Sequence, residues 1–143
     1  MAGKYITPLS YKAMSERDVK NLYKLCKVDY YGIKPEEIVA EVIKKDKQLW
    51  RFKATKAQGI IVTNLVKHGS AHELWIAGIA GFGYRRIMQE LLKELLVYFQ
   101  PFNVRWVSSN VRDGMGEKYI KLHEDMLGAK RRAVTCSLDL TER

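Results

Sequence analysis

The sequence has few of the features that mark disulfide-bonded, metal-binding or membrane-spanning proteins. Its two cysteines, Cys26 and Cys136, stand alone without CxxC or Cys/His spacing, which indicates neither a disulfide framework nor a metal site. No apolar run approaches the roughly 20 residues that span a bilayer, and the start lacks the apolar segment of a signal peptide. Repeats, linkers and low-complexity segments are missing as well. The 143 residues are therefore expected to form one cytoplasmic domain, spanning 1–143, with an ordinary hydrophobic core.

Acidic residues are in the minority. The chain carries 25 Lys and Arg against 16 Asp and Glu, which gives a net charge of +9 and an isoelectric point near 9.6. This balance favours an anionic partner, either a nucleic acid or a phosphorylated cofactor. The charge is spread along the chain, however, and aromatic residues do not alternate with the basic runs as they do on base-stacking surfaces. A row such as Lys20, Lys24 and Lys27 is a solvated helix face as readily as a binding patch, so charge alone does not identify the partner.

The stretch from residue 71 to residue 99 organises the rest of the chain. It opens with a short apolar run at 74–77, continues with Gly78, Gly81 and Gly83, and ends in a long amphipathic segment at 84–99. Apolar residues recur in that segment at helical spacing, with charged residues on the opposite face. The order predicts a strand, a glycine loop and a helix.

A glycine loop that opens into a helix is a ready site for an anion. The N–H groups of the first helical turn lack partners within the helix, the helix dipole is positive there, and glycine lets a phosphate approach the backbone. Gly81, Phe82, Gly83 and Tyr84 would supply loop amides, and Arg85 a cation in the first turn. The same glycines are equally consistent with a tight turn, and Arg85 with a solvated residue. The loop pattern by itself leaves both interpretations open.

Hydrophobic periodicity, capping signals and turn residues predict the remaining elements. Strands are expected at 6–12, 48–54, 60–66, 73–77, 104–108 and 132–140. Further helices are expected at 16–27, from Pro35 onward, and at 117–127; the first has Ser15 as its N-cap and an apolar face of Val19, Leu22, Tyr23 and Cys26. The order β-α-α-β-β-β-α-β-α-β describes an α/β (α+β) fold with a mixed, largely antiparallel central sheet flanked by helices.

This order, with a glycine loop between the fourth strand and the third helix, resembles the GNAT superfamily of acyl-CoA N-acyltransferases over nearly the whole chain. The loop pattern of that family is Arg/Gln-x-x-Gly-x-Gly/Ala, whose backbone amides hold the pyrophosphate of coenzyme A. Gly81 and Gly83 match its two glycines, while Gly78 stands at the Arg/Gln position. Asn110 matches an asparagine that follows the fifth strand in the family and bonds the pantetheine arm.

The end of the chain departs further from the family pattern. Family members carry a helix that ends in a Tyr four residues before a Gly-Phe pair. Gly128 matches the glycine, but Ala129 replaces the Phe and Glu124 stands at the Tyr position. The segment from Asn110 to Gly128 is also several residues longer than in the family.

The resemblance implies that the protein binds acetyl-CoA, or another acyl-CoA, and that a neutral amine attacks the thioester directly. Such a site needs a base for the ammonium and an N–H group for the developing oxyanion. Glu73 is the only carboxylate on the fourth strand and is the candidate base; the alternative is an outward-facing strand residue beside His72. The backbone of Ile76, on the same strand, is the candidate contact for the acyl carbonyl.

The leaving thiolate also needs a proton. Tyr119, earlier on the last helix than the family Tyr, is the candidate acid, with packing against the sheet as its alternative, and His123 is a second candidate. His68 and His72 flank a turn and are assigned no role. No Ser/His/Asp or Cys/His arrangement follows from the spacing, so covalent catalysis is not expected.

The resemblance also suggests a cofactor site and partners. The residues expected to contact acetyl-CoA (coenzyme A) are Ile76, Gly81, Phe82, Gly83, Tyr84, Arg85 and Asn110. The sequence does not identify the amine acceptor, although a basic surface would suit an acidic or nucleic-acid-associated one. Family members often form homodimers. No membrane partner is expected.

Some features are also similar to small GNAT-like proteins of tailed bacteriophages. These are a strand ending in Trp, an Arg-rich helix start at 84–88, the VRWV run before Asn110 and the Leu-Gly-Ala helix end. This resemblance implies a second hypothesis, in which the fold is retained in a structural or internal virion protein that has lost the chemistry. A third hypothesis is a basic nucleic-acid-binding module, whose binding would weaken steeply with salt.

Overall fold

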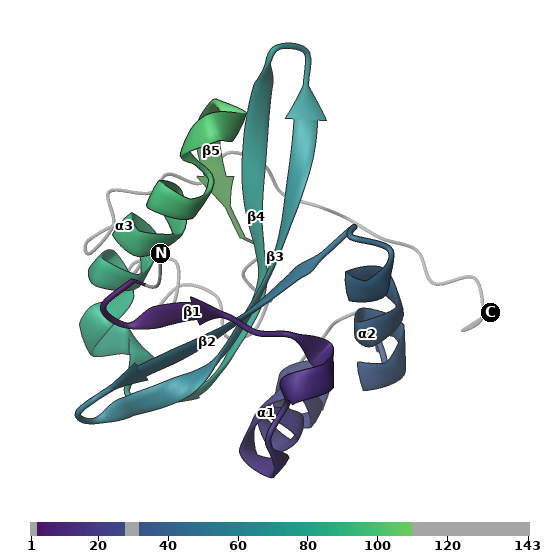
Figure 1. Ribbon diagram of the computed structural model, residues 1–143, viewed down its shortest axis with the longest axis vertical. Coiled ribbons are helices and arrows are strands. Elements are labelled where there is room, and N and C mark those ends of the chain that lie inside the picture. Colours follow the sequence, from purple (N-terminus) through teal and green to yellow (C-terminus); the bar gives the residue numbers. More distant parts are fainter. Residues whose placement is uncertain (1–2, 28–31, 110–143) are drawn as a thin grey trace, which may run out of the picture. The chain divides into compact units, whose positions relative to one another are not determined.

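A computed structural model of the protein describes residues 3–27 and 32–109 (Figure 1). By their internal contacts the residues group into two units, Met1–Asn110 and Val111–Arg143, and every described residue belongs to the first. The helix expected at 117–127 and the strand expected at 132–140 lie outside the described residues. Among the helices that the structure describes, none has the length and apolar character needed to cross a membrane.

The centre of the first unit is a five-stranded sheet in the order β1-β2-β3-β4-β5. The strands are β1 (Ile6–Pro8), β2 (Gln48–Ala54), β3 (Ala57–His68), β4 (Ala71–Phe82) and β5 (Val104–Ser108). Neighbours from β1 to β4 run antiparallel, and β5 runs parallel to β4. The mixed, largely antiparallel sheet predicted from the sequence is therefore confirmed over these strands.

Helices cover both faces of this sheet. α1 (Glu16–Lys27) and α2 (Pro35–Ile43) lie on one face and α3 (Met88–Tyr98) lies on the other (Figure 1). Three short 3-10 turns connect the elements: η1 (Tyr11–Ala13), η2 (Tyr84–Ile87) and η3 (Gln100–Phe102). The hairpin of β3 and β4 extends beyond the helices at the top of Figure 1.

Each face of the sheet has its own hydrophobic core. The buried residues of the α3 side are Ile6, Trp50, Phe52, Ala57, Ile61, Leu74, Leu91, Leu95 and Phe99. Those of the α1 and α2 side are Leu9, Leu22, Leu25, Ile38, Leu49, Ile60, Val62 and Ala80. Successive strand residues point to opposite faces, so β2 and β3 contribute to both cores. Because both faces of these strands are buried, a shift of their pairing by one residue would move each side chain to the wrong core, so the register is fixed.

α1 begins with the capping box that the sequence predicts. Ser15 Oγ accepts a hydrogen bond from the backbone N–H of Asp18 (3.2 Å), and Asp18 Oδ2 accepts one from the N–H of Ser15 (2.9 Å). The Asp18 carboxylate is buried and also pairs with Arg51 of β2. The helix start is thus attached to the sheet as well as capped.

The buried face of α1 differs from the predicted one. Leu22 and Leu25 are buried together with Asp18, at the spacing i, i+4 and i+7 of one helix face. Val19 and Tyr23, which the sequence suggested as apolar-face residues, are 40% and 50% exposed. The prediction was right for Leu22 and for Cys26, which packs against this core, and wrong for Val19 and Tyr23, because the ion pair of Asp18 turns their side of the helix outward.

Several element boundaries also differ from the predictions, and β3 and β4 are both longer than the predicted strands at 60–66 and 73–77. β1 ends at Pro8 instead of residue 12, because proline has no N–H for the strand ladder and the following residues form η1. α3 begins at Met88 instead of Tyr84, because the chain leaves Gly83 in a left-handed conformation (φ 71°) and first makes the 3-10 turn η2. The helix at 16–27, the helix start at Pro35 and the strand at 104–108 are confirmed.

A β-bulge lies in the middle of β4. The register of β4 against β3 shifts by one residue at Ala77, which lies between the paired residues Ile76 and Gly78. Leu74 and Ile76 face the α3 core, and after the bulge Ile79 does so. The extra residue therefore exchanges the two faces of the strand, and Gly78 comes to face α1.

Candidate functional site

The glycine corner at the end of β4 is tighter than the predicted loop. Gly81 and Phe82 belong to the strand, and Gly83 alone connects it to η2. A Cβ atom on Gly81 would lie 2.1 Å from the carbonyl oxygen of Gln58, and one on Gly83 would lie 2.0 Å from that of Lys56. The close approach of the β2–β3 hairpin therefore requires both glycines. The tight turn therefore explains why both positions are glycine, independently of any ligand that binds at the corner.

Positive charge surrounds this corner. Lys24 of α1 donates a hydrogen bond from Nζ to the carbonyl oxygen of Gly81, 3.2 Å away. Arg85 and Arg86 are exposed in η2. Gly83, as N-cap of that turn, provides no side-chain oxygen for the first N–H groups. Several cations beside the start of this turn suit the binding of an anion such as a diphosphate.

The two aromatic residues of the corner have different surroundings. The ring of Tyr84 packs edge-on against Phe52, with 6.2 Å between ring centroids, and belongs to the α3 core. Phe82 is 54% exposed. A ligand at the corner can therefore contact the ring of Phe82, whereas Tyr84 can offer its backbone.

Gly78 stands where the family pattern has Arg or Gln, and the structure explains the departure. A Cβ atom on Gly78 would lie 2.7 Å from side-chain atoms of Leu25 in α1. The helix packs so closely on β4 that a long side chain has no room there. The neighbouring Lys24 instead brings a cation from α1 to the corner.

Part of β4 has an open edge. Residues 72–75 pair with β5, which ends at Ser108 opposite Trp75. Among the described residues, 76–82 pair with β3 alone. Ile76 precedes the bulge directly, and Ala77 is exposed. Gly83 is six positions after Ala77. At roughly 3.3 Å per residue, the strand from the bulge to the glycine corner is about 20 Å long.

Glu73 is buried near the other end of β4. It is only 2% exposed, so the outward-facing alternative is wrong. Its Oε1 lies 2.9 Å from Nε2 of His68, and its Oε2 accepts a hydrogen bond from Oγ of Ser108. The three residues come from β4, β3 and β5, and we call them the Glu73 cluster. These partners satisfy both oxygens of the buried carboxylate.

Aromatic packing fixes the exposed side of the Glu73 cluster. The ring of His68 packs edge-on against Trp106 of β5, with 5.8 Å between centroids and planes 87° apart. The guanidinium of Arg105 lies 4.9 Å from the centroid of the Trp106 ring. The His68 side chain is 47% exposed, whereas that of Glu73 is 3% exposed. Solvent therefore reaches the histidine of the pair, and the carboxylate lies behind it.

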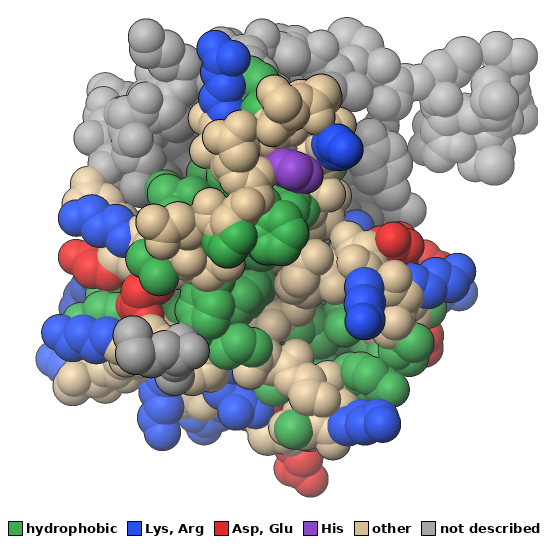
Figure 2. Space-filling model, turned by 45° about the horizontal axis from the view of Figure 1, so that its top comes forward, with side chains coloured by type: hydrophobic (Ala, Val, Ile, Leu, Met, Phe, Trp, Pro, Cys, Tyr) green, Lys and Arg blue, Asp and Glu red, His purple; other side chains and the backbone are tan. Residues whose placement is uncertain are grey.

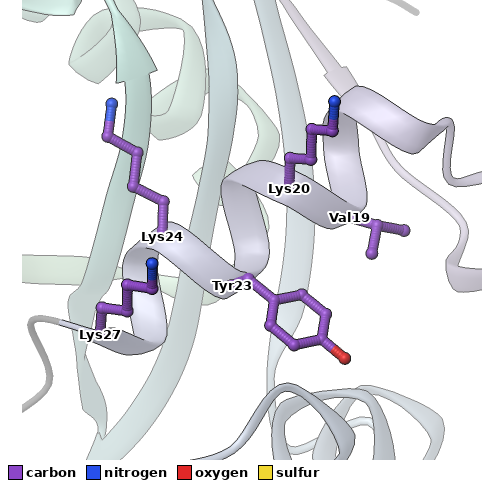
Figure 3. Close-up of a pocket in the computed structure, with 5 residues that line it drawn as sticks. All are labelled: Val19, Lys20, Tyr23, Lys24 and Lys27. Atoms are coloured by element: carbon purple, nitrogen blue, oxygen red, sulfur yellow. The ribbon is translucent and has the colours of Figure 1, made fainter.

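A hollow of about 550 Å³ lies beside α1 (Figure 3). In Figure 3 the lysine side chains point away from the ring of Tyr23. The hollow is lined by Val19, Lys20, Tyr23, Lys24 and Lys27. On the face shown in Figure 2, Lys and Arg side chains are scattered over several elements instead of forming one block. The lysine row on α1 is thus a local basic feature next to the glycine corner, which Lys24 reaches.

Some predicted site residues cannot be placed. Asn110, the candidate acid Tyr119 and its alternative His123 lie outside the described residues. Within 3–27 and 32–109, no three His, Cys, Asp or Glu side chains come together as a metal site would require. Of the predicted residues that are described, 76–85 lie along the bulge and the corner, and Glu73 lies beyond the bulge.

Sequence reasoning missed three residues of this region. Lys24 meets Gly81 across a separation of 57 residues, for which the sequence carries no local signal. Ser108 likewise reaches Glu73 only through the pairing of β4 with β5. His68 was within reach, because a hairpin that pairs His68 with Ala71 makes Glu73 its diagonal neighbour.

No protein-family model matches the chain, and no curated protein is similar to it in sequence. Several solved structures share its fold. A possible acetyltransferase from Clostridium difficile 630 superimposes with a TM-score of 0.67 at 14% identity, covering 94% of this chain and 96% of its own. A predicted acetyltransferase from Clostridium acetobutylicum, crystallised with acetyl-CoA, gives 0.61 at 11% identity, covering 96% and 97%.

An aminoglycoside acetyltransferase from an uncultured soil metagenomic sample, in complex with sisomicin, gives a TM-score of 0.65 at 9% identity, covering 94% of this chain and 95% of its own. At such identities the similarity concerns the fold alone. The described strands and helices have the order and pairing of the GNAT fold, as the sequence predicted. The fold does not identify the reaction, which has to be argued from the site.

Proposed function

We propose that this protein is an N-acetyltransferase that transfers the acetyl group of acetyl-CoA to an amine by direct attack. The observation that carries the proposal is the layout of β4, which joins a cationic glycine corner, an open edge with a bulge, and a buried carboxylate. Acyl transfer from a long phosphorylated thiol needs these three parts in that order. Similarity in fold to acetyltransferases, one of them crystallised with acetyl-CoA, supports it.

The residues at the corner fit the pyrophosphate of coenzyme A. Lys24 Nζ is held at Gly81, the turn η2 starts directly after Gly83, and Arg85 lies in that turn. Phe82 offers an exposed ring beside them. Coenzyme A supplies the activated thioester. The chain supplies the cations and amides that hold its charged end, and in the proposal Asn110 contributes to the pantetheine arm.

The bulge and the Glu73 cluster serve the reacting end. Ala77 lies in the bulge, outside the regular pairing with β3, and Ile76, which pairs with Thr63, precedes it directly. An N–H group there stabilises negative charge that develops on the acyl oxygen. Glu73 provides the negative charge that favours removal of a proton from the ammonium. Tyr119 remains the proposed acid for the thiolate.

The acceptor is proposed to be an amine on an acidic molecule. The hollow beside α1 combines three lysines with the exposed side chains of Val19 and Tyr23. Its charge favours negatively charged partners, in keeping with the net charge of +9. An acidic protein or a nucleic-acid-associated protein with an accessible amine meets this description.

The proposal is tested by an acetyl-transfer assay. Purified protein is incubated with acetyl-CoA and each of three amines: spermidine, sisomicin and an acidic peptide that contains one lysine. The concentration of free thiol is followed with time, and the masses of the products are measured by mass spectrometry. We expect thiol release that depends on at least one amine, with one acetyl group added to it. Binding of acetyl-CoA without transfer to any amine would contradict catalysis.

A non-enzymatic role is the second candidate, and Gly78 is the observation that favours it. The family has Arg or Gln at this position. Here the side chain of Leu25 occupies the space that such a residue would need. In this view the fold serves as a structural virion protein or binds nucleic acid through its basic surface. Association with duplex DNA or RNA that weakens steeply between 50 and 200 mM salt, about 10³-fold for six phosphate contacts, would favour the nucleic-acid role. Absence of such binding would remove it.

A further inference from the structure

His68 is the solvent-facing member of the Glu73 cluster. Both oxygens of Glu73 are engaged, Oε1 with His68 and Oε2 with Ser108. The carboxylate is almost fully buried, whereas nearly half of the imidazole is exposed. An amine that enters from solvent therefore meets His68 first.

The contact with Glu73 determines which nitrogen of His68 can accept a proton. An ionised carboxylate only accepts hydrogen bonds, so Nε2 of His68 must carry a hydrogen and donate it to Oε1. In the neutral ring the lone pair then lies on Nδ1. The edge-on contact with Trp106 restricts rotation of the ring. The cluster thus holds the imidazole in one tautomer and one orientation.

The Glu73 cluster lies close to the expected position of the acyl group. Ala77 is four residues beyond Glu73, or roughly 13 Å along the strand. Ser108 is paired with Trp75, where β5 ends and the open edge of β4 begins. A thioester that reaches from the glycine corner to the bulge therefore ends two residues from Trp75, the partner of Ser108 in the cluster.

We propose that His68, held by Glu73, is the general base for the acceptor amine, an inference that rests on the proposed function. The acceptor arrives as an ammonium and gives one proton to Nδ1 of His68. The nitrogen lone pair attacks the thioester carbon, the C–N bond forms and the C–S bond breaks. The second surplus proton of the nitrogen goes to the leaving sulfur, which yields amide and free thiol. The proton on His68 is released to water.

Glu73 is then a positioning residue that stabilises the imidazolium. Its negative charge faces the proton that Nε2 retains, and Ser108 keeps the carboxylate in place. Arg105 of β5 lies over the indole of Trp106, against which the ring of His68 packs. In this arrangement the proton is transferred to a histidine that an acceptor amine can reach from solvent. The buried carboxylate acts on the histidine and does not contact the substrate.

The test compares His68→Gln, Glu73→Gln and the double variant in the acetyl-transfer assay with spermidine, sisomicin and the acidic peptide. Loss of a general base lowers kcat by about 10²-fold or more. We expect this loss in each single variant, with unchanged affinity for acetyl-CoA, and no greater loss in the double variant, because the residues act as a unit.

His72→Gln is the matched control. His72 lies at the same end of the hairpin, on the opposite face of β4 from Glu73, with its ring edge-on to Phe102. It should transfer acetyl groups at the wild-type rate. Where Glu73→Gln fails to fold, Glu73→Asp replaces it, and a partial rate is expected.

A second measurement needs no acceptor. Diethylpyrocarbonate modifies accessible imidazoles, and the modified peptide that contains His68 is followed by mass spectrometry. Acetyl-CoA should slow this modification while leaving that of His72 unchanged. Wild-type transfer with an equally active His68→Gln would overturn the inference alone. Absence of both acetyl-CoA binding and transfer in the wild type would overturn the proposed function itself.

Discussion

Arg51 in the middle of β2 donates hydrogen bonds from Nε and Nη2 to the two carboxylate oxygens of Asp18 at the start of α1. Burial alone would raise the pKa of Asp18, but the hydrogen bonds from Arg51 and Ser15 outweigh it and hold that pKa below its usual value. The hydrogen bond to Asp18 in turn raises the pKa of Arg51. This pair fixes α1 against the sheet, and α1 carries Lys24 to the glycine corner.

Asp18→Ala should lower the free energy of unfolding by about 3 kcal/mol, because it removes one partner of a buried ion pair and the hydrogen bond from the N–H of Ser15 to the carboxylate. Urea denaturation measures this change. Glu16→Ala, an exposed acidic residue in the same first turn, should change stability by less than about 0.5 kcal/mol. Equal effects of the two substitutions would show that the contact with Arg51 contributes no stability.

The contribution of Asp18 should also depend on pH. Since its pKa is lower in the folded state, the unfolded chain binds the proton first on acidification. The stabilisation is present above the pKa of the unfolded state and is lost progressively below about pH 5. Urea midpoints of wild type and Asp18→Asn should therefore differ at pH 7 and converge toward pH 2. A difference that stays constant down to pH 2 would contradict the ion pair.

Gly78→Gln restores a side chain of the family pattern, and the structure predicts that it will not fit. The first added atom would lie 2.7 Å from the Leu25 side chain, and overpacking of this kind costs about 1–3 kcal/mol. Thermal unfolding should show the loss, and Leu25→Ala should compensate part of it in the double variant. Ala77→Gln, at the exposed neighbouring position, is the control and should have little effect on stability. An unchanged melting temperature for Gly78→Gln would mean that α1 does not pack on β4 as described.

Much of the fold follows from local patterns in the sequence. The capping box at Ser15, the Pro35 start and the alternation of the strands are signals between residues close in the chain, and the structure confirms them. The buried face of α1 was wrong because Arg51, which selects it, lies 33 residues from Asp18. The helix predicted at 84–99 is present but starts at Met88, because the conformation of Gly83 imposes a 3-10 turn before it.

The candidate site was predictable only in part. Glu73 and the glycines stand out in the sequence because few residues could fill their roles. Lys24 and Ser108 become part of the site through contacts between distant elements. The bulge at Ala77 has no composition signal, yet it decides that Gly78 faces Leu25. Homodimer formation, cytoplasmic location and the roles of Asn110 and Tyr119 remain predictions.

Lys24→Met should weaken binding of acetyl-CoA, because Lys24 Nζ lies at the corner assigned to the pyrophosphate. A charge-assisted hydrogen bond contributes roughly 1.5–3 kcal/mol, so the dissociation constant should rise about tenfold or more. Lys27→Met, one turn along the same helix, is the matched control. Titration calorimetry at two salt concentrations measures both. Equal affinities for the two variants would remove Lys24 from the site. Gly83→Glu is a poorer test, because a side chain there collides with the Lys56 backbone even without ligand.

Thermal unfolding with and without acetyl-CoA tests the central claim most directly. Ligand at about a hundred times its dissociation constant stabilises a protein by roughly 2.7 kcal/mol, which for a domain of this size is a shift of several degrees. Desulfo-CoA and AMP are the controls for the pantetheine arm and for the nucleotide alone. The account predicts a shift with acetyl-CoA and desulfo-CoA that is larger than with AMP and smaller in Lys24→Met. No shift at millimolar acetyl-CoA would contradict it, and the glycines of β4 would then only turn the chain.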